Sequence, residues 1–121
     1  MLNSLNISGN VLGGVDVPLP EDLGQMTSLT SLDLSTNQFS GLIPESIGNM
    51  ENLVELRMDK NFLAGELPAS VTQLGEIQIL SVSGNSLSKL PAGLTALTKL
   101  EELQLSNNQI EEIPAEIFNG L

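Results

Sequence analysis

The sequence repeats one apolar pattern five times. The pattern is Leu-x-x-Leu-x-Leu-x-x-Asn, with Ile, Met or Val in place of some leucines, and a Leu-Pro or Ile-Pro dipeptide follows each copy. Successive copies are 27, 24, 24 and 23 residues apart, counted between Asn10, Asn37, Asn61, Asn85 and Asn108. Such a period predicts a stack of similar coils, each burying its apolar side against its neighbours. We expect a single elongated domain with repeats at residues 2–28, 29–52, 53–76, 77–99 and 100–121.

Each copy of the pattern alternates apolar and polar residues, which predicts a short strand. The side chains expected to point inward are Leu5/Ile7, Leu32/Leu34, Leu56/Met58, Leu80/Val82 and Leu103/Leu105. Strands stacked in register form a parallel sheet with a spacing of about 4.8 Å, and the residues between the inward ones share its outer face. We predict that the asparagines form a structural ladder, because a side-chain amide can both donate to and accept from the backbone of a bend.

The prolines mark the return path of each coil. Because proline fixes φ and lacks a donor, it suits irregular or 3₁₀ backbone on the side opposite the sheet. Behind each proline we expect two core side chains spaced to share one face of a helical turn, namely Leu23/Met26, Ile47/Met50, Val71/Leu74, Leu94/Leu97 and Phe118/Leu121. The three extra residues of the first repeat, around Val15-Asp16-Val17, predict a bulge.

Residues 37–50 read Asn-Gln-Phe-Ser-Gly-Leu-Ile-Pro-Glu-Ser-Ile-Gly-Asn-Met. This segment resembles the Asn-x-Leu-Ser-Gly-x-Ile-Pro-x-x-Ile-Gly-x-Leu motif of plant-type leucine-rich repeats, and residues 61–74 resemble it too. The last two repeats lack the glycine and are similar to the 23-residue form of animal and bacterial members. The resemblance implies an α/β fold: a right-handed solenoid of five coils with a concave parallel sheet and an irregular or 3₁₀ convex side. The caps that usually close such a stack are missing, so we expect a segment of a longer protein, or self-association through the ends.

Composition argues against several classes of function. The chain has 15 acidic and 4 basic residues, and its net charge of -11 disfavours nucleic acid and anionic lipid as partners. It contains no Cys and no His, which removes the commonest metal ligands and the commonest general base. No apolar run is long enough to insert into a membrane. We therefore expect no catalytic residues, no metal and no cofactor, and we leave the cellular location open.

The remaining role is the binding of a protein or peptide, as the resemblance also implies. The third and fourth repeats concentrate charge and exposed apolar side chains on the sheet face, and arginine and aromatic residues dominate many interfaces. The candidate contact residues are Asp33, Glu55, Arg57, Asp59, Lys60, Phe62, Ile79, Ser81 and Gln104. The competing interpretation of these residues is structural: Arg57 pairs with Asp33 on the next strand, and Phe62 packs against its own loop.

Two other functions remain open. A ladder of Ser, Asn and Thr side chains could contact a glycan or ice, although Asp59 interrupts the column of Ser8, Ser35, Ser83 and Ser106. The repeats could also regulate an enzyme whose catalytic domain lies outside this chain.

Overall fold

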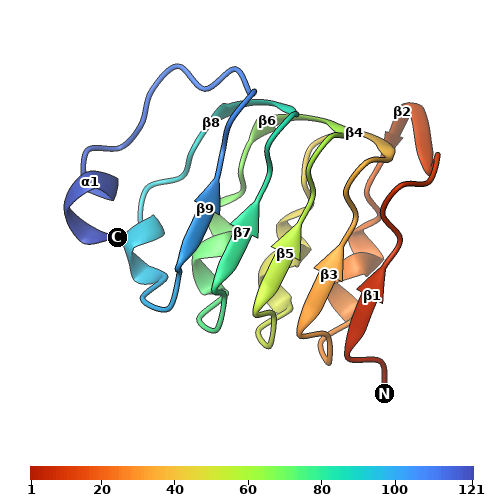
Figure 1. The fold of residues 1–121 in the computed structure, drawn as a ribbon, viewed down its shortest axis with the longest axis horizontal. Helices are drawn as coiled ribbons and strands as arrows, with labels where there is room; N and C mark the ends of the chain where they lie inside the picture. Colours follow the sequence, from red (N-terminus) through yellow and green to blue (C-terminus); the bar gives the residue numbers. More distant parts are fainter.

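One strand from each repeat joins a single parallel sheet (Figure 1). The computed structural model describes residues 1–121, apart from the side chain of Val15. The strands follow the order of the chain: β1 (Ser4–Asn6), β3 (Ser31–Asp33), β5 (Glu55–Arg57), β7 (Ile79–Ser81) and β9 (Glu102–Gln104). Equivalent residues pair directly, so that Leu32 lies between Leu5 and Leu56. The predicted solenoid is confirmed, with five strands on one side and helical turns on the other.

A second parallel sheet, which the sequence pattern did not predict, follows the asparagines. Its strands are β2 (Gly13–Pro18), β4 (Gln38–Gly41), β6 (Phe62–Glu66) and β8 (Ser86–Lys89), in that order. Phe39, Leu63 and Leu87 point into the core from the last three of these strands. The predicted bulge in the first repeat is confirmed: β2 pairs with β4 only at Gly13–Gln38 and Pro18–Ser40, with a shift of register between them.

Short helices complete the coils on the side opposite the five-stranded sheet. Four of them are 3₁₀ helices: η1 (Glu21–Gln25), η2 (Glu45–Asn49), η3 (Ala69–Gln73) and η4 (Leu94–Ala96). The first three begin directly after Pro20, Pro44 and Pro68, whose extended backbone leads into the turn. The last element is the α-helix α1 (Ile117–Gly120).

The expected core pair of the last repeat was wrong. Phe118 is 75% exposed and Leu121 is 49% exposed, whereas Ile117 packs against the core. Leu23, Ile47, Val71 and Leu94 all lie three residues after a proline, and the same count from Pro114 leads to Ile117. The prediction was therefore out of register by one residue.

The core runs through the stack and is densest in the middle coils. The inward side chains of β3, β5 and β7 are at most 2% exposed, while Leu5 and Leu103 in the first and last strands are only partly buried. A coil with a neighbour on one side only leaves part of its apolar surface uncovered. Leu2 and Leu12 at one end, like Phe118 and Leu121 at the other, are exposed, and self-association through these ends stays a prediction. In the described part of the chain, no helix is long and apolar enough to cross a bilayer.

Candidate functional site

The asparagine ladder joins each coil to the one before it. The Asn61 amide nitrogen donates to the carbonyl of Leu34 in the preceding coil (3.0 Å) and to Met58 (3.3 Å) and Asp59 (3.2 Å) in its own bend. Its oxygen accepts from the Phe39 backbone N–H of the preceding coil at 3.2 Å. The same four kinds of bond recur at Asn37, Asn85 and Asn108. These bonds fix the end of each strand and hence the outward residues beside it.

Asn10 differs from the other ladder asparagines in its bonds among the described residues. It is exposed, and its amide bonds only the carbonyls of Ile7 (2.9 Å) and Ser8 (3.4 Å) in its own bend. Asn10 is thus the member of the ladder whose hydrogen bonds stabilise its own bend and do not join two coils.

The outward residues of the five-stranded sheet form the surface that we call the strand face. It comprises the columns Ser4, Ser31, Glu55, Ile79, Glu102; Asn6, Asp33, Arg57, Ser81, Gln104; and Ser8, Ser35, Asp59, Ser83, Ser106, of which the first two are paired in the sheet. Because equivalent side chains lie one strand apart, neighbours within a column can contact one another.

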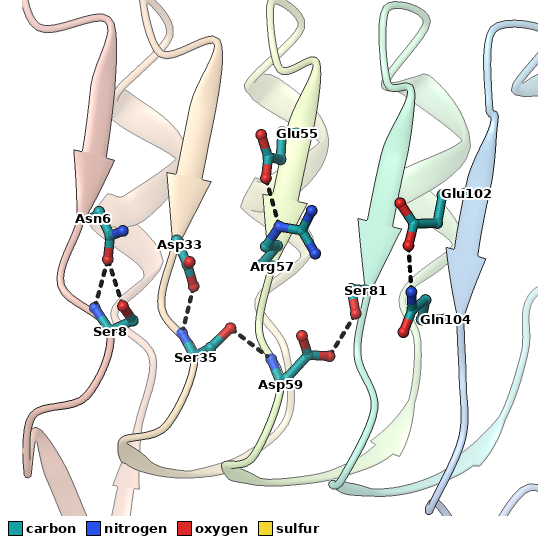
Figure 2. A network of polar contacts seen from close by, with 10 residues as sticks. All are labelled: Asn6, Ser8, Asp33, Ser35, Glu55, Arg57, Asp59, Ser81, Glu102 and Gln104. Carbon is teal, nitrogen blue, oxygen red and sulfur yellow. Dashed lines mark hydrogen bonds and ion pairs between the residues drawn. The ribbon is translucent and has the colours of Figure 1, made fainter.

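Arg57 bonds Glu55 on its own strand, with 2.5 Å between Nε and Oε1 (Figure 2). The alternative interpretation, in which Arg57 pairs with Asp33, is wrong, because the Asp33 carboxylate instead accepts from the Ser35 backbone N–H at 3.0 Å. The hydrogen bond to Glu55 raises the pKa of Arg57 above its ordinary value, and the charges of Glu55, Glu102 and Asp33 act in the same direction. About a third of each side chain is exposed (31% for Arg57 and 35% for Glu55), so the pair is accessible from solvent.

Asp59 links three strands of the sheet. Its carboxylate accepts from the Ser81 hydroxyl at 2.6 Å, and its own N–H donates to the Ser35 hydroxyl at 3.1 Å (Figure 2). The carboxylate also accepts from the Ser83 backbone N–H at 2.7 Å. Ser81 is only 1% exposed, which removes it from the residues that a partner could touch. The pattern within one repeat does not reveal this burial, and the side chain that Ser81 bonds belongs to the neighbouring repeat.

The other candidates on or beside the strand face have different surroundings. Ile79 is half-buried, and Gln104 is exposed and bonds Glu102 on its own strand. Lys60 is exposed at the position before the ladder asparagine, with a φ of 54°. The structure therefore brings Asp33, Glu55, Arg57 and Ile79 together on adjacent strands β3, β5 and β7, and Asp59 lies two residues after β5.

Phe62 lies apart from the strand face, because it begins β6 in the second sheet. Its side chain is 62% exposed, so the interpretation that it packs against its own loop is wrong. Phe62 lines a hollow of about 520 Å³ together with Gly14, Asp16, Gln38 and Ser40. The three extra residues of the first repeat predicted the bulge that borders this hollow, but no sequence pattern placed the bulge near Phe62.

The described residues contain no group of three carboxylate, Cys or His side chains that could hold a metal ion. The strand face instead presents hydrogen-bond acceptors around one guanidinium. Such an arrangement can bind polar and charged groups without forming or breaking a covalent bond.

Comparison with known proteins identifies the repeat. Residues 76–118 match a family model described as "Leucine Rich repeats (2 copies)", and residues 28–50 match one described as "Leucine Rich Repeat". None of the curated protein sequences compared with the chain matched it.

Three solved structures illustrate the similarity. The ectodomain of the receptor kinase SOBIR1 from Arabidopsis thaliana is 30% identical, with a TM-score of 0.84 over 97% of this chain and 62% of that one. The ectodomain of the Arabidopsis receptor kinase HAESA, in complex with a peptide hormone ligand, is 36% identical, with a TM-score of 0.81 over 88% of this chain and 18% of that one. A leucine-rich-repeat protein of Leptospira interrogans is 32% identical, with a TM-score of 0.80 over 96% of this chain and 28% of that one. The chain thus spans less than two thirds of each.

Proposed function

This chain is a leucine-rich-repeat protein, and from that premise we propose that it is a non-catalytic module that binds a protein or peptide through its strand face. The similarity to an ectodomain solved with a peptide hormone supports the proposal. One observation carries it further. Asp33 and Glu55 lie beside Arg57 on the adjacent, registered strands β3 and β5, Asp59 lies two residues after β5, and the ladder and the backbone hydrogen bonds hold these strands in place.

The charge of this surface favours a partner with basic groups. Four carboxylates lie on the strand face, from Asp33, Glu55, Asp59 and Glu102, against the single guanidinium of Arg57. Arg57 would engage a carboxylate of the partner with the nitrogens that do not contact Glu55, since a guanidinium carries five donors. The half-buried Ile79 would provide an apolar contact beside these charges.

Size limits the affinity that this surface can provide. Five strands spaced by about 4.8 Å give a face roughly 20 Å wide, which amounts to about a few hundred Å² of sheet. A stable complex buries about 800 Å² per partner. We therefore expect weak binding by this chain alone, with dissociation constants in the micromolar range or above.

The proposal is tested with peptides selected from a random 12-residue display library against the complete chain. Arg57→Ala is expected to weaken binding of a selected peptide by about 1–3 kcal/mol, because the guanidinium lies at the centre of the contact. Ser4→Ala, at an exposed position on the first strand, serves as the control and is expected to change it by less than about 0.5 kcal/mol. Titration calorimetry measures both. If alanine substitutions in the first or fifth repeat, or in the proline-containing segments, weaken binding most, another surface binds the peptide.

The contacts of the serine column give no support to binding of a glycan or ice. The Ser106 hydroxyl donates to Ser83 at 3.0 Å, and the Ser35 hydroxyl accepts from the Asp59 N–H. Regulation of an enzyme outside this chain is a function that the same strand face would serve, because it too requires binding of a protein segment.

A further inference from the structure

The bulge of the first repeat is the main departure of the chain from its own period. Between the two points at which β2 pairs with β4, β2 has four residues, 14–17, where β4 has one. Asp16 adopts a left-handed backbone with a φ of 61°, which is uncommon for a residue other than glycine. The Ser40 hydroxyl donates to the carbonyls of Gly14 (3.4 Å) and Val17 (3.3 Å) and thereby ties the bulge to β4.

This bulge and Phe62 border the same hollow. Its lining comes from three adjacent strands: Gly14 and Asp16 from β2, Gln38 and Ser40 from β4, and Phe62 from β6. We call it the bulge hollow. No atom lies within 4 Å of the point where a Cβ on Gly14 would stand, so this part of the wall is open backbone. An exposed ring and a carboxylate therefore face a shared space of about 520 Å³.

The chemistry of the bulge hollow matches a guanidinium. An aromatic face attracts a cation, and arginine stacks on such faces more often than lysine. A carboxylate accepts a guanidinium through two parallel hydrogen bonds. Among the residues whose side chains are described, the ion pairs are Arg57–Glu55 and Lys99–Glu76, and neither involves Asp16. The net charge of -11 also favours a basic partner.

We propose that the bulge hollow binds an arginine side chain of a partner protein or peptide. The guanidinium stacks on Phe62 and donates to the carboxylate of Asp16, while Gln38 and Ser40 line the space around the aliphatic stem. This site lies in the second sheet, away from the strand face, and so goes beyond the function proposed above.

The test is a titration of the ¹⁵N-labelled complete chain with acetyl-Gly-Arg-Gly-amide, followed by NMR. The expected shifts lie at Asp16, Gln38 and Phe62 and saturate at millimolar peptide. The same peptide with citrulline, which keeps the shape of arginine but lacks its charge, is expected to bind at least tenfold more weakly. The lysine peptide is expected to bind at least threefold more weakly, because an ammonium cannot form the two parallel bonds.

Two variants locate the contact without threatening the fold. Asp16→Asn removes the charge, and asparagine tolerates a left-handed backbone, so we expect binding at least fivefold weaker. Phe62→Leu removes the aromatic face from an exposed side chain and is expected to weaken binding at least threefold. The matched controls are Asp22→Asn and Phe118→Leu, which are exposed and outside the hollow and are expected to change binding less than twofold.

Several outcomes would overturn the proposal. Equal binding of the arginine and citrulline peptides would show that the charge does not contribute to binding. Equal binding of the arginine and lysine peptides would show that the hollow does not prefer a guanidinium. Equal losses in Asp16→Asn and Asp22→Asn would indicate general attraction to an acidic chain. Shifts centred on Glu55 and Asp59 would place the arginine on the strand face instead.

Discussion

Asn61→Ala is expected to lower the free energy of unfolding by about 3–5 kcal/mol. The substitution removes four hydrogen bonds at once, to the carbonyls of Leu34, Met58 and Asp59 and from the N–H of Phe39. The three carbonyls keep a second donor, so each of their lost bonds costs about 0.5–1.5 kcal/mol, whereas the Phe39 N–H is left without a partner at a cost of about 1–3 kcal/mol. Asn61 is 5% exposed, so water cannot readily replace the amide. Urea denaturation measures the loss, provided that the slope of the transition stays constant.

The matched control is Asn10→Ala, which removes the same amide from the same place in the repeat. Asn10 is exposed and bonds only its own bend, and so we expect a loss below about 1 kcal/mol. Ser83→Ala on the strand face should cost under about 0.5 kcal/mol. Equal losses for Asn61→Ala and Asn10→Ala would mean that the ladder does not hold one coil to the next.

The second large effect is expected for Gly48→Ala in η2. A Cβ on Gly48 would lie 2.6 Å from the carbonyl oxygen of Ser70 and 2.7 Å from its Cβ, in the next coil. Real Cβ atoms do not approach other atoms so closely, and the obstructing oxygen belongs to the backbone. The coils must therefore move apart, at an expected cost of about 2–3 kcal/mol, as for other overpacked positions. The shift of the urea midpoint relative to the wild-type chain measures this cost.

Gly75→Ala is the control for Gly48→Ala. It follows Leu74 as Gly48 follows Ile47, but nothing lies within 4 Å of its would-be Cβ, and its φ is not left-handed. We expect a change within about 0.5 kcal/mol. If both glycines tolerate alanine equally, the distance between η2 and η3 does not limit how closely the coils stack.

The coils, the strand register and the ladder could be predicted because the same pattern of apolar residues and asparagine occurs in five copies. Each inward leucine occupies the same place in every copy, and a stack buries those places together. Leu32, Leu56 and Leu80 therefore form one continuous row in the core. Asparagine at the bend was likewise a sound structural prediction, because few side chains both donate to and accept from a backbone that lacks a strand partner.

The second sheet and the pairing of surface side chains could not be predicted. Strands β4, β6 and β8 are short and contribute few core side chains, so their apolar pattern is too brief to distinguish from a loop. Arg57 had several carboxylates within reach, and exposed ion pairs differ little in energy. Ser81 is buried and bonds Asp59 in the previous repeat, a contact that no local pattern encodes.

The backbone conformation at the bend could not be predicted from the sequence either. The residue before each ladder asparagine is left-handed, with φ between 54° and 73° at Gly9, Thr36, Lys60, Gly84 and Asn107. Glycine and asparagine favour this conformation, but threonine and lysine do not, so Thr36 and Lys60 give no sign of it in the sequence. At these positions the bend required by the ladder overrides the local preference of the residue.

The most direct test of the proposed function is to map a selected peptide on the complete chain by amide chemical shifts. If the strand face binds, the largest shifts will lie on β3, β5 and β7, at Asp33, Glu55, Arg57 and Ile79, and η1 to η4 will stay unchanged. Arg57→Ala should reduce these shifts at the same subsaturating peptide concentration, in line with binding weaker by about 1–3 kcal/mol. Shifts centred on the helical side, or an unchanged map in Arg57→Ala, would contradict the assignment of the strand face as the binding surface.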